Sequence, residues 1–328
     1  MEVLFVCSSV DEKFPQRDYH VCRELRMLGC KVRVVSAYNP VFGVLGVLRF
    51  RRVKCKIFCG FRAGVLALLL RPLVGEYFYD VVEWKADLCR DNWRGIKRLL
   101  VPLVEIVDKM IIRCARVVFN AGKGFVHPFL RGLRWKVVFA ENGYNNELFN
   151  PEKYDRRLVR EKYGVNFPLV VYIGKLTNMY VRYLVPVIEA MNIVRERFPS
   201  AEFWIIGDGA AREVLMEAAK GVSGVRVLGY VPYERVPEFV VMADVGVNAY
   251  NTESLKLREW LAMGLPVIAP QEVKFPGVTS CKWTRGEIAG SIIRLLENGG
   301  RVKVKVKLNT WRDTAEIIMS TCRRLYGD

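Results

Sequence analysis

The residues with the clearest chemical potential lie late in the chain, in the segment that runs from Ser254 to Ala269. Its pattern predicts a helix that follows a strand, ends at a glycine and leads directly into a buried strand. The first backbone N–H groups of this helix, at Ser254, Leu255 and Lys256, are well placed for a diphosphate. Glu259 follows about one turn later, where its carboxylate could accept hydrogen bonds from the hydroxyls of a ribose. The segment therefore predicts a nucleotide site, although an ordinary crossover with a surface glutamate would have the same spacing.

Strand and helix signals alternate in the first half of the chain and predict a scaffold for such a site. A strand at Val3–Cys7, a helix at Tyr19–Leu28 and a strand at Lys31–Val35 form a βαβ opening. This opening implies a parallel sheet that binds ligands at the carboxyl ends of its strands. The other predicted elements of this half are strands at 77–83, 116–119 and 136–139 and a long helix at 96–114, interrupted by Pro102.

The second half of the chain repeats the alternation, which predicts a second α/β domain. A linker is predicted between the halves at 150–166, because this stretch contains Pro151 and many charges. A length of 328 residues also suits two domains. The predicted strands lie at 169–174, 202–206, 225–228, 245–247 and 266–269, and the helices at 181–197, 211–219, 236–243 and 254–263.

The charge of the chain is strongly positive and unevenly distributed. The net charge is +17, and the region from Arg49 to Lys136 contains 19 basic and 7 acidic residues. A solvated basic surface or nucleic-acid binding would also explain this excess. We favour an anionic membrane surface as the partner, because the basic residues alternate with apolar blocks at 44–48 and 65–70. Aromatic platforms that stack RNA bases are not evident, so no specific nucleic acid is expected.

The apolar runs and the cysteines of the sequence indicate where in the cell the protein is expected. The longest strongly apolar run, Ala63 to Leu70, is far shorter than the roughly 20 residues of a membrane-spanning helix. The first residues read as a strand and not as a secretory signal. Nine scattered cysteines, with only Cys55 and Cys59 close together, favour small buried side chains over a zinc site. We therefore expect a cytoplasmic protein, either free or peripheral on the cytoplasmic face of a membrane.

Five segments in a fixed order resemble glycosyltransferase family 4. Residues 256–269 are similar to the family's donor-binding signature, Lys-Leu-x-Glu-(Tyr/Trp)-(Leu/Met)-Ala-x-Gly-x-Pro-Val-Ile. The loop at 141–151, the strand and turn at 170–176 and the strand end Ile205-Ile206-Gly207-Asp208-Gly209 resemble other family segments. Residues 311–325 look like its terminal helix. The resemblance is strongest from about Val137 to Ala269 and weak from Val41 to Arg113.

The resemblance implies a fold and an activity. The expected fold is GT-B, with two Rossmann-like α/β domains facing a central cleft and a C-terminal helix that crosses back to the N-terminal domain. The acceptor-side domain would comprise residues 1–150 and 311–328, and the donor-binding domain residues 151–310. The implied activity is a retaining, hexosyltransferase-like transfer from a UDP-, GDP- or ADP-linked sugar to a glycan or a lipid-linked acceptor. No metal and no cofactor are implied.

The resemblance also implies roles for single residues of the donor domain. Glu259 would bind the donor ribose, and Lys175, beside Gly174, would bind the diphosphate. Backbone groups at Tyr230 and Val231 would meet the base, and the amides of 254–257 the phosphates.

Two positions depart from the family pattern. Asn251 stands where the family has a first glutamate, and Glu253, two residues away, is an out-of-register substitute. Tyr180 stands where the family has a lysine, which leaves Arg182 as the nearest cation for the phosphate. These departures are typical of a divergent subfamily, and they keep loss of catalysis as an alternative.

On the acceptor side, Glu83 and Asp87 follow the strand at 77–83, and either could accept a proton from the acceptor. His20 begins the first helix, near a family position that lies close to the cleft, although a structural hydrogen bond would equally explain it. His127 reads as structural. Two other functions stay open, a catalytically degenerate binding or partner protein and a nucleotide-sugar epimerase.

Overall fold

The computed structural model describes residues 1–8, 16–121, 127–250, 254–299 and 307–327. The chain forms two compact units. Unit 1 comprises Met1–Gly143 and Asn309–Asp328, and unit 2 comprises Tyr144–Leu308.

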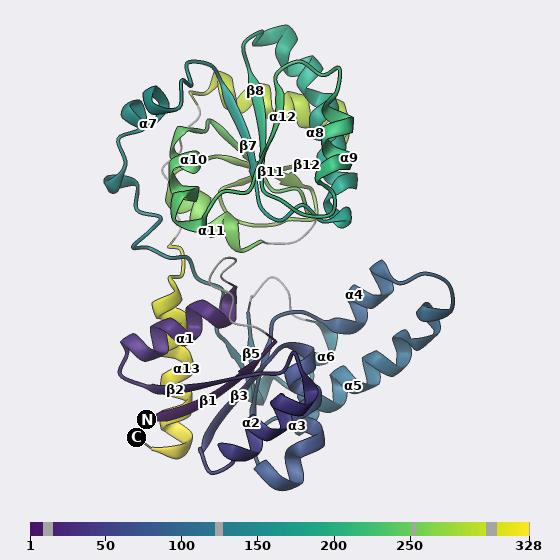
Figure 1. Cartoon of the computed structure of the whole chain (residues 1–328), viewed down its shortest axis with the longest axis vertical. Coiled ribbons are helices and arrows are strands. Elements are labelled where there is room, and N and C mark those ends of the chain that lie inside the picture. Colours follow the sequence, from purple (N-terminus) through teal and green to yellow (C-terminus); the bar gives the residue numbers. More distant parts are fainter. Residues whose placement is uncertain (9–15, 122–126, 251–253, 300–306, 328) are drawn as a thin grey trace. The chain divides into compact units, whose positions relative to one another are not determined.

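Unit 1 contains a six-stranded sheet in the order β2-β1-β3-β4-β5-β6 (Figure 1). Each neighbouring pair is parallel. The central β1 is buried on both faces because helices cover both sides of the sheet, which explains its continuous apolar run. The strands are β1 (Glu2–Cys7), β2 (Lys31–Ser36), β3 (Cys55–Cys59), β4 (Phe78–Val81), β5 (Val117–Asn120) and β6 (Val137–Phe139).

The helices of unit 1 include two elements for which no sequence signal was recognised, α2 and α3. The apolar run at 63–70 lies in α3, where Ala63, Leu66 and Ala67 pack into the core of the unit. None of the helices that the structure describes is long and apolar enough to cross a membrane. The helices are α1 (Arg17–Met27), α2 (Pro40–Arg49), α3 (Gly60–Val74), α4 (Lys85–Asn92), η1 (Gly95–Leu100), α5 (Val101–Cys114), α6 (Pro128–Arg131), η2 (Arg134–Lys136) and α13 (Trp311–Tyr326).

The helix predicted at 96–114 consists of two elements. A 3₁₀ helix, η1, ends at Leu100, and α5 begins at Val101 with Pro102 in its first turn. Proline is tolerated in a first turn because the N–H that it lacks has no partner inside the helix there. The prediction that Pro102 interrupts the helix is therefore correct, and the change of helix type marks the interruption.

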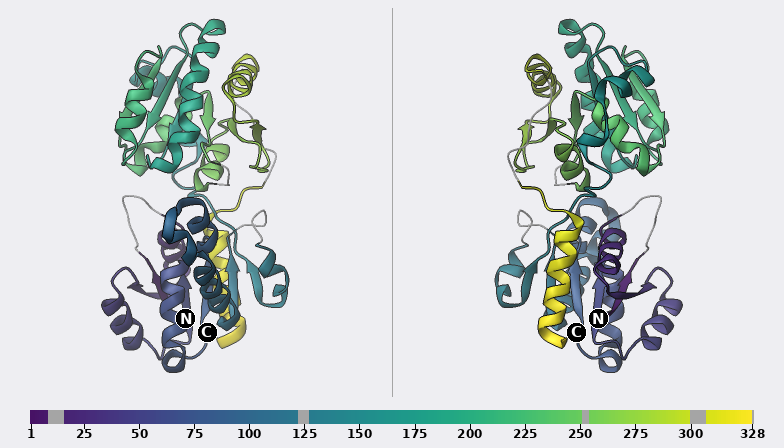
Figure 2. Two further views of the ribbon diagram at one scale, coloured as in Figure 1. Left: turned by 90° about the vertical axis from the view of Figure 1, so that its right-hand side faces the viewer. Right: turned by 90° about the vertical axis from the view of Figure 1, so that its left-hand side faces the viewer.

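The C-terminal helix α13 packs on unit 1, as predicted (Figure 2). Its first residue, Trp311, stacks on the imidazole of His20 with ring centroids 4.8 Å apart, and Tyr326 near its end stacks on Phe78 at 5.7 Å. Thr310 and Asp313 form a capping box at its start. A side chain at Gly143 would put its Cβ 2.3 Å from the backbone of Thr310, so the approach requires glycine.

Two of the cysteines form a disulfide, whereas small buried side chains without a partner were expected. The structure joins Cys55 of β3 to Cys322 of α13 in a disulfide, with their Cα atoms 6.2 Å apart. Cys59, the close neighbour of Cys55 in the sequence, is a free buried thiol.

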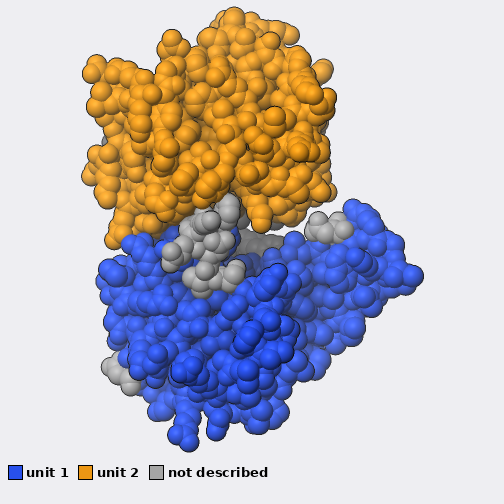
Figure 3. Space-filling view, in the orientation of Figure 1, with its two compact units in different colours: residues 1–143, 309–328 blue, residues 144–308 orange. Residues whose placement is uncertain are grey.

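Unit 2, drawn in orange in Figure 3, contains a six-stranded parallel sheet in the order β12-β11-β10-β7-β8-β9. This is the strand order of a Rossmann domain, which confirms the predicted fold class for this half. The strands are β7 (Leu169–Ile173), β8 (Glu202–Ile206), β9 (Val225–Gly229), β10 (Val245–Val247), β11 (Val267–Pro270) and β12 (Val278–Cys281). The helices are η3 (Pro151–Lys153), α7 (Arg156–Lys162), α8 (Asn178–Arg197), α9 (Arg212–Ala219), η4 (Tyr233–Arg235), α10 (Val236–Met242), α11 (Leu255–Ala262) and α12 (Arg285–Glu297).

The linker predicted at 150–166 is wrong, because this segment folds as η3 and α7 within unit 2. Arg156 and Arg160 of α7 both form ion pairs with Asp244, which precedes β10. The many charges of the segment therefore attach it to the unit.

A buried ion pair in unit 1 gives a stability prediction. Arg17 of α1 donates to both carboxylate oxygens of Asp80 of β4 through Nε, at 2.9 and 3.1 Å, and to one of them through Nη2 at 3.0 Å. Its Nη1 donates to Asn142 at 3.1 Å. Both Arg17 and Asp80 are almost completely buried. We expect Asp80→Asn to lower the free energy of unfolding by about 3–5 kcal/mol, since it leaves a buried guanidinium without its counter-charge.

Urea unfolding of the two proteins measures the difference. Glu2→Gln, which breaks the exposed pair with Arg33, is the control and should change little. Equal stability of Asp80→Asn and wild type would contradict the prediction.

Candidate functional site

The candidate site lies at the carboxyl edge of the unit 2 sheet. The strand order reverses between β7 and β10, and ligands of open α/β sheets bind at such a point. The loops that follow the strands here begin at Gly174 after β7, Gly207 after β8, Tyr230 after β9 and Asn248 after β10.

Glycines let two of these loops pack directly on each other. The amide of Gly174 donates to Ile206 O, and that of Leu176 to Asp208 O, both at 2.9 Å. A Cβ at Gly207, whose φ is 144°, would lie 1.9 Å from Gly174 O. The Gly-Asp-Gly sequence thus fixes the turn that contains Gly174 and Lys175, and no side chain fits between the loops.

Lys256, on the first turn of α11, reaches back to the end of β7. Its Nζ donates to Ile173 O at 3.1 Å and lies 3.8 Å from the ring centroid of Tyr172 and 5.1 Å from a ring of Trp260. A Cβ at Gly174 would be 3.4 Å from this Nζ. The ammonium therefore lies beside the turn predicted to contact the diphosphate, over aromatic faces that attract a cation.

Glu259 lies one turn after Lys256, and its side chain is buried at the same edge. Its carboxylate accepts a hydrogen bond from the hydroxyl of Tyr233 in η4. Burial raises the pKa of Glu259 to about 7, against the opposing effects of Tyr233 and Lys256. Burial lowers the pKa of Lys256 to about 7, and the charge of Glu259 opposes that shift. The charged forms of both side chains are therefore poorly solvated at this site.

The N-terminus of α11 is not capped by its own N-cap side chain. Ser254 donates its hydroxyl to Asn248 Oδ1 at 2.7 Å and makes no side-chain cap. Asn248 is fully buried and donates in turn to Tyr250 O at 2.9 Å. The serine therefore ties the helix start to the end of β10, and the first-turn amides near Leu255 are left for a ligand.

The other residues expected at the donor site lie around this centre. Lys175 is exposed, and Arg182 is exposed with its guanidinium 5.0 Å from the ring centroid of Tyr183. Tyr180 packs against Tyr172 and Tyr250, with ring centroids 6.0 and 5.7 Å away. Tyr230 is exposed and Val231 is half-buried. Asn251 and Glu253 lie outside the residues that the structure describes.

Two features of this site were not predicted from the sequence. Tyr233 was not singled out, because it comes from a 3₁₀ turn after β9 that has no recognised spacing relation to Glu259. Lys256 was predicted only for its backbone amide. Its place three residues before Glu259 on an eight-residue helix was the available signal, since residues at i and i+3 share a face.

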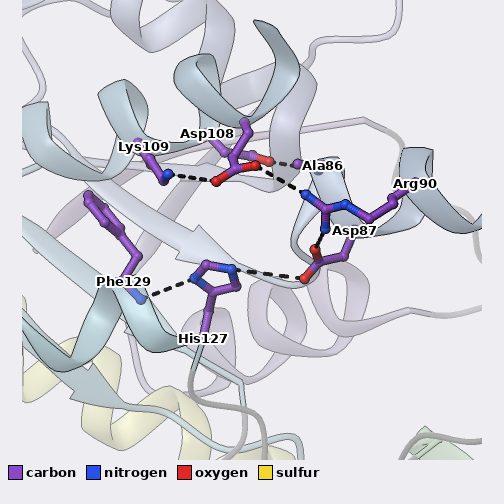
Figure 4. Close-up of polar contacts among 8 residues, drawn as sticks. Ala86, Asp87, Arg90, Asp108, Lys109, His127 and Phe129 are labelled. Carbon is purple, nitrogen blue, oxygen red and sulfur yellow. Dashed lines mark hydrogen bonds and ion pairs between the residues drawn. The ribbon is translucent and has the colours of Figure 1, made fainter. Parts of the chain in front are cut away.

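The acceptor-side candidates in unit 1 lie in different surroundings, and Figure 4 shows those of Asp87. Asp87, in the first turn of α4, pairs with Arg90 and lies 4.0 Å from Nε2 of His127. Glu83 is exposed, with Lys85 3.5 Å away. His20 instead packs against Trp311, and burial lowers its pKa to about 4, so it is neutral at physiological pH.

Asp108 and His127 position the segment that contains Glu83 and Asp87. Oδ2 of Asp108 accepts from the amide of Ala86 at 2.9 Å and so caps α4, whose own N-cap residue Trp84 provides no side-chain cap. Burial raises the pKa of Asp108 to about 6. His127 stacks on Trp84 with centroids 3.6 Å apart and caps α6 through Nδ1. The structural interpretation of His127 agrees with these contacts.

A surface pocket of about 560 Å³ lies elsewhere in unit 2, beside α7. Arg156 and Arg160 line it, but both are engaged with Asp244. Asp244 precedes β10, so this pocket is near the amino ends of the strands, away from the edge that binds ligands in such folds. Within the described part of the chain, no group of three or more His, Cys, Asp or Glu side chains could hold a metal ion.

Comparison with known proteins agrees with this geometry. Residues 167–298, all within unit 2, match the family model of Glycosyl transferases group 1. The alpha-monoglucosyldiacylglycerol synthase of Acholeplasma laidlawii is 27% identical over 243 residues, which cover 70% of this chain. The match spans only 57% of the length of that relative.

Solved structures of low sequence identity have the same fold. HepE of Anabaena in complex with UDP superposes with a TM-score of 0.71 at 14% identity, covering 99% of this chain and 95% of HepE. Sucrose-phosphate synthase of Thermosynechococcus elongatus gives a TM-score of 0.71 at 15% identity, with 98% and 94% covered. These structures confirm the predicted GT-B fold, and the family match over residues 167–298 confirms the resemblance to glycosyltransferases.

The two buried charges give opposite pH dependences of stability. The raised pKa of Glu259 means that the folded protein binds more protons than the unfolded chain between about pH 4.5 and 7. Its contribution to the free energy of unfolding therefore falls as the pH rises through this window. We expect Glu259→Gln to reduce this fall by on the order of 1–3 kcal/mol.

Lys256→Met tests the other half of the pair. With a lowered pKa, Lys256 favours folding increasingly as the pH rises from about 7 to 10.5, so the variant should lose that rise. Urea unfolding across the pH range measures both slopes, with exposed Glu213→Gln as the control. Unchanged slopes in both variants would show that neither group is buried in solution.

Proposed function

We propose that this protein transfers a sugar from a nucleotide-diphosphate sugar to an acceptor. The sequence match of unit 2 to glycosyltransferases and the GT-B fold of the chain support this proposal. The observation that carries the proposal is that half-buried Lys256 and buried Glu259 lie one helical turn apart at the reversal point of the unit 2 sheet. A charge removed from water costs free energy unless it is well satisfied. A ligand with a diphosphate and a ribose would satisfy both.

Glu259 is proposed to bind the ribose. A carboxylate has room for several hydrogen bonds, and in the free protein Tyr233 donates one of them. Two vicinal hydroxyls could donate the others. Ionisation of Glu259 is then favoured in the complex, because hydrogen bonds to the charged form lower a carboxyl pKa.

Lys256 is proposed to supply the cation that Tyr180 does not. Its ammonium lies at Gly174, beside the turn that resembles the family's phosphate-contacting turn, although it comes from a different helix than the family's lysine. Among the described residues, Nζ of Lys256 donates to one acceptor, Ile173 O, so its other N–H groups are proposed to bind phosphate oxygens. Lys175 and the first amides of α11 would add to the charge stabilisation.

The proposed transfer breaks the bond between the anomeric carbon and the diphosphate, which leaves with the bonding electrons. The acceptor hydroxyl oxygen forms the new bond, with retention of configuration, and loses its proton to a carboxylate. Glu83 is the better candidate for this base, because its contact with Lys85, at 3.5 Å, is longer than the contact of Asp87 with Arg90. Fixed positive groups around the leaving diphosphate make a metal ion unnecessary in this scheme.

The proposed donor is a hexose linked to UDP, and the proposed acceptor is a glycan or a lipid-linked molecule at the cytoplasmic face of a membrane. HepE is bound to UDP and to UDP-glucose in its structures, which favours UDP over GDP and ADP. The relative from Acholeplasma is named for a glucosyldiacylglycerol, a lipid. The alternative, a catalytically degenerate binding protein, is favoured by Tyr180, which leaves the family's phosphate lysine without a direct replacement on α8.

Nucleotide-dependent thermal stabilisation tests the donor site. UDP at about 100 times its dissociation constant should raise the free energy of unfolding of the wild type by about 2.7 kcal/mol. Glu259→Ala and Lys256→Met should lose most of this gain, and GDP and ADP should give less. Exposed Glu234→Gln, next to Tyr233, is the matched control and should respond as the wild type does.

The outcomes separate the two functions. Stabilisation by UDP without release of UDP from UDP-sugars and candidate acceptors would favour the binding protein. A wild type that no nucleotide stabilises would overturn the donor site itself.

Chelation tests the proposed independence of a metal. We expect transfer to continue at an unchanged rate in excess EDTA, because side chains and amides carry the positive charge at the diphosphate. UDP release is the readout, and a manganese-dependent glycosyltransferase in the same buffer is the positive control. A loss of activity that Mg²⁺ or Mn²⁺ restores would contradict this part of the proposal.

A further inference from the structure

We propose that the outer face of η1 and α5 in unit 1 is a docking surface for an anionic lipid bilayer. Six aliphatic side chains form a continuous stripe along these two helices, with Ile96 82% exposed and Leu99 77% exposed. Apart from the adjacent Leu99 and Leu100, steps of three or four residues keep the stripe on one side of the helices. Its members, here called the η1–α5 stripe, are Ile96, Leu99, Leu100, Leu103, Ile106 and Met110, all of them exposed.

The opposite face of α5 is already packed, so the stripe is free of the core. Ile111 and Ile112 are buried, and the hydroxyl of Tyr77 donates to Ile111 O at 2.8 Å. The ammonium of Lys136 donates to Ile112 O at 2.8 Å and Ala115 O at 3.1 Å, which satisfies the end of the helix. Because α5 is held in this orientation, the stripe cannot turn inward. Figure 1 shows α4 and α5 reaching away from the sheet of unit 1.

Charge identifies the occupant as an anionic lipid surface. Lys97 and Arg98 are exposed within the stripe, and no ion pair with another described residue is recorded for either. By contrast, Lys109 of α5 and Arg90 of the neighbouring α4 both pair with Glu105. Aliphatic side chains interleaved with unmatched cations are typical of helices that lie in the headgroup region of a membrane.

Composition and length fit a bilayer better than a protein partner. Energetically dominant anchors of protein interfaces are enriched in tryptophan and tyrosine, and the η1–α5 stripe contains neither. From Ile96 to Met110 the stripe extends for roughly 20 Å, at about 1.5 Å per residue. This is too short to cross a hydrocarbon core of about 30 Å but long enough to lie along its surface.

A bilayer-docking surface would bring the protein to the proposed lipid-linked acceptor. The biological role of the surface therefore rests on the proposed function, but bilayer binding itself does not. Bilayer binding is measured without nucleotide or acceptor, whereas nucleotide binding tests unit 2 without vesicles. Failure of the one is therefore distinguishable from failure of the other.

Co-sedimentation with vesicles tests the surface. The wild type should bind phosphatidylcholine vesicles that contain about one third phosphatidylglycerol, and should bind pure phosphatidylcholine more weakly. The pair Leu99→Glu and Leu103→Glu should weaken binding at least about tenfold. The pair Lys97→Gln and Arg98→Gln should weaken binding to the anionic vesicles only and reduce its sensitivity to salt.

The matched control is Leu158→Glu with Val214→Glu, which adds the same charge at two exposed aliphatic side chains of unit 2 and should keep most of the binding. Urea unfolding verifies that each variant is folded, and Leu99→Ser with Leu103→Ser replaces the glutamate pair if that pair does not fold. Three results would overturn the proposal: no vesicle binding by the wild type, equal binding by the stripe variant, or an equal loss in the control. A wild-type dimer that the stripe variant dissolves, seen by size exclusion, would assign the stripe to a second copy instead.

Discussion

Parallel pairing of the strands is the constraint on which the rest of the molecule depends. Two parallel neighbours cannot be joined by a tight turn, so each connection must cross a face of the sheet, and helices cover both faces. All carboxyl ends then meet at one edge. In unit 2 the order reverses at β7 and β10, and the loops after these strands supply Gly174 and the start of α11. The candidate site is a consequence of topology before any particular side chain is considered.

Buried charges in this chain divide into two kinds by how completely they are satisfied. Arg17 in unit 1 is held by Asp80 and Asn142, and the ammonium of Lys136 donates to three carbonyl oxygens. Both charged groups have a structural role, because their N–H donors have hydrogen-bond partners within unit 1. Lys256 has one recorded acceptor, two aromatic faces and a nearby carboxylate whose pKa is raised by burial. A charge that costs the folded protein free energy in this way is typical of a site where a ligand completes the network.

Much of the fold and half of the donor site could be predicted from the sequence. Buried parallel strands are continuous apolar runs, and Glu259 follows its helix start at a fixed spacing, so local patterns sufficed for both. Side-chain contacts over long distances could not be predicted in this way. Tyr233 meets Glu259 from another connection, and α7 looked like a linker because only the fold brings Asp244 to its arginines. The apolar run in α3 has no helical periodicity because apolar side chains also occupy its exposed side, at Leu69 and Leu73.

The return of α13 to unit 1 has a consequence for how the chain acquires its structure during synthesis. Unit 2 is a continuous segment, so all of it is synthesised before Trp311 is added to the chain. Until then His20 and Phe78 lack their stacking partners, and Cys55 lacks Cys322. Unit 1, whose synthesis begins first, can therefore complete its folding only after unit 2 has been synthesised. A nascent chain stalled anywhere within unit 2 exposes an apolar face on unit 1, where chaperones would be expected to bind.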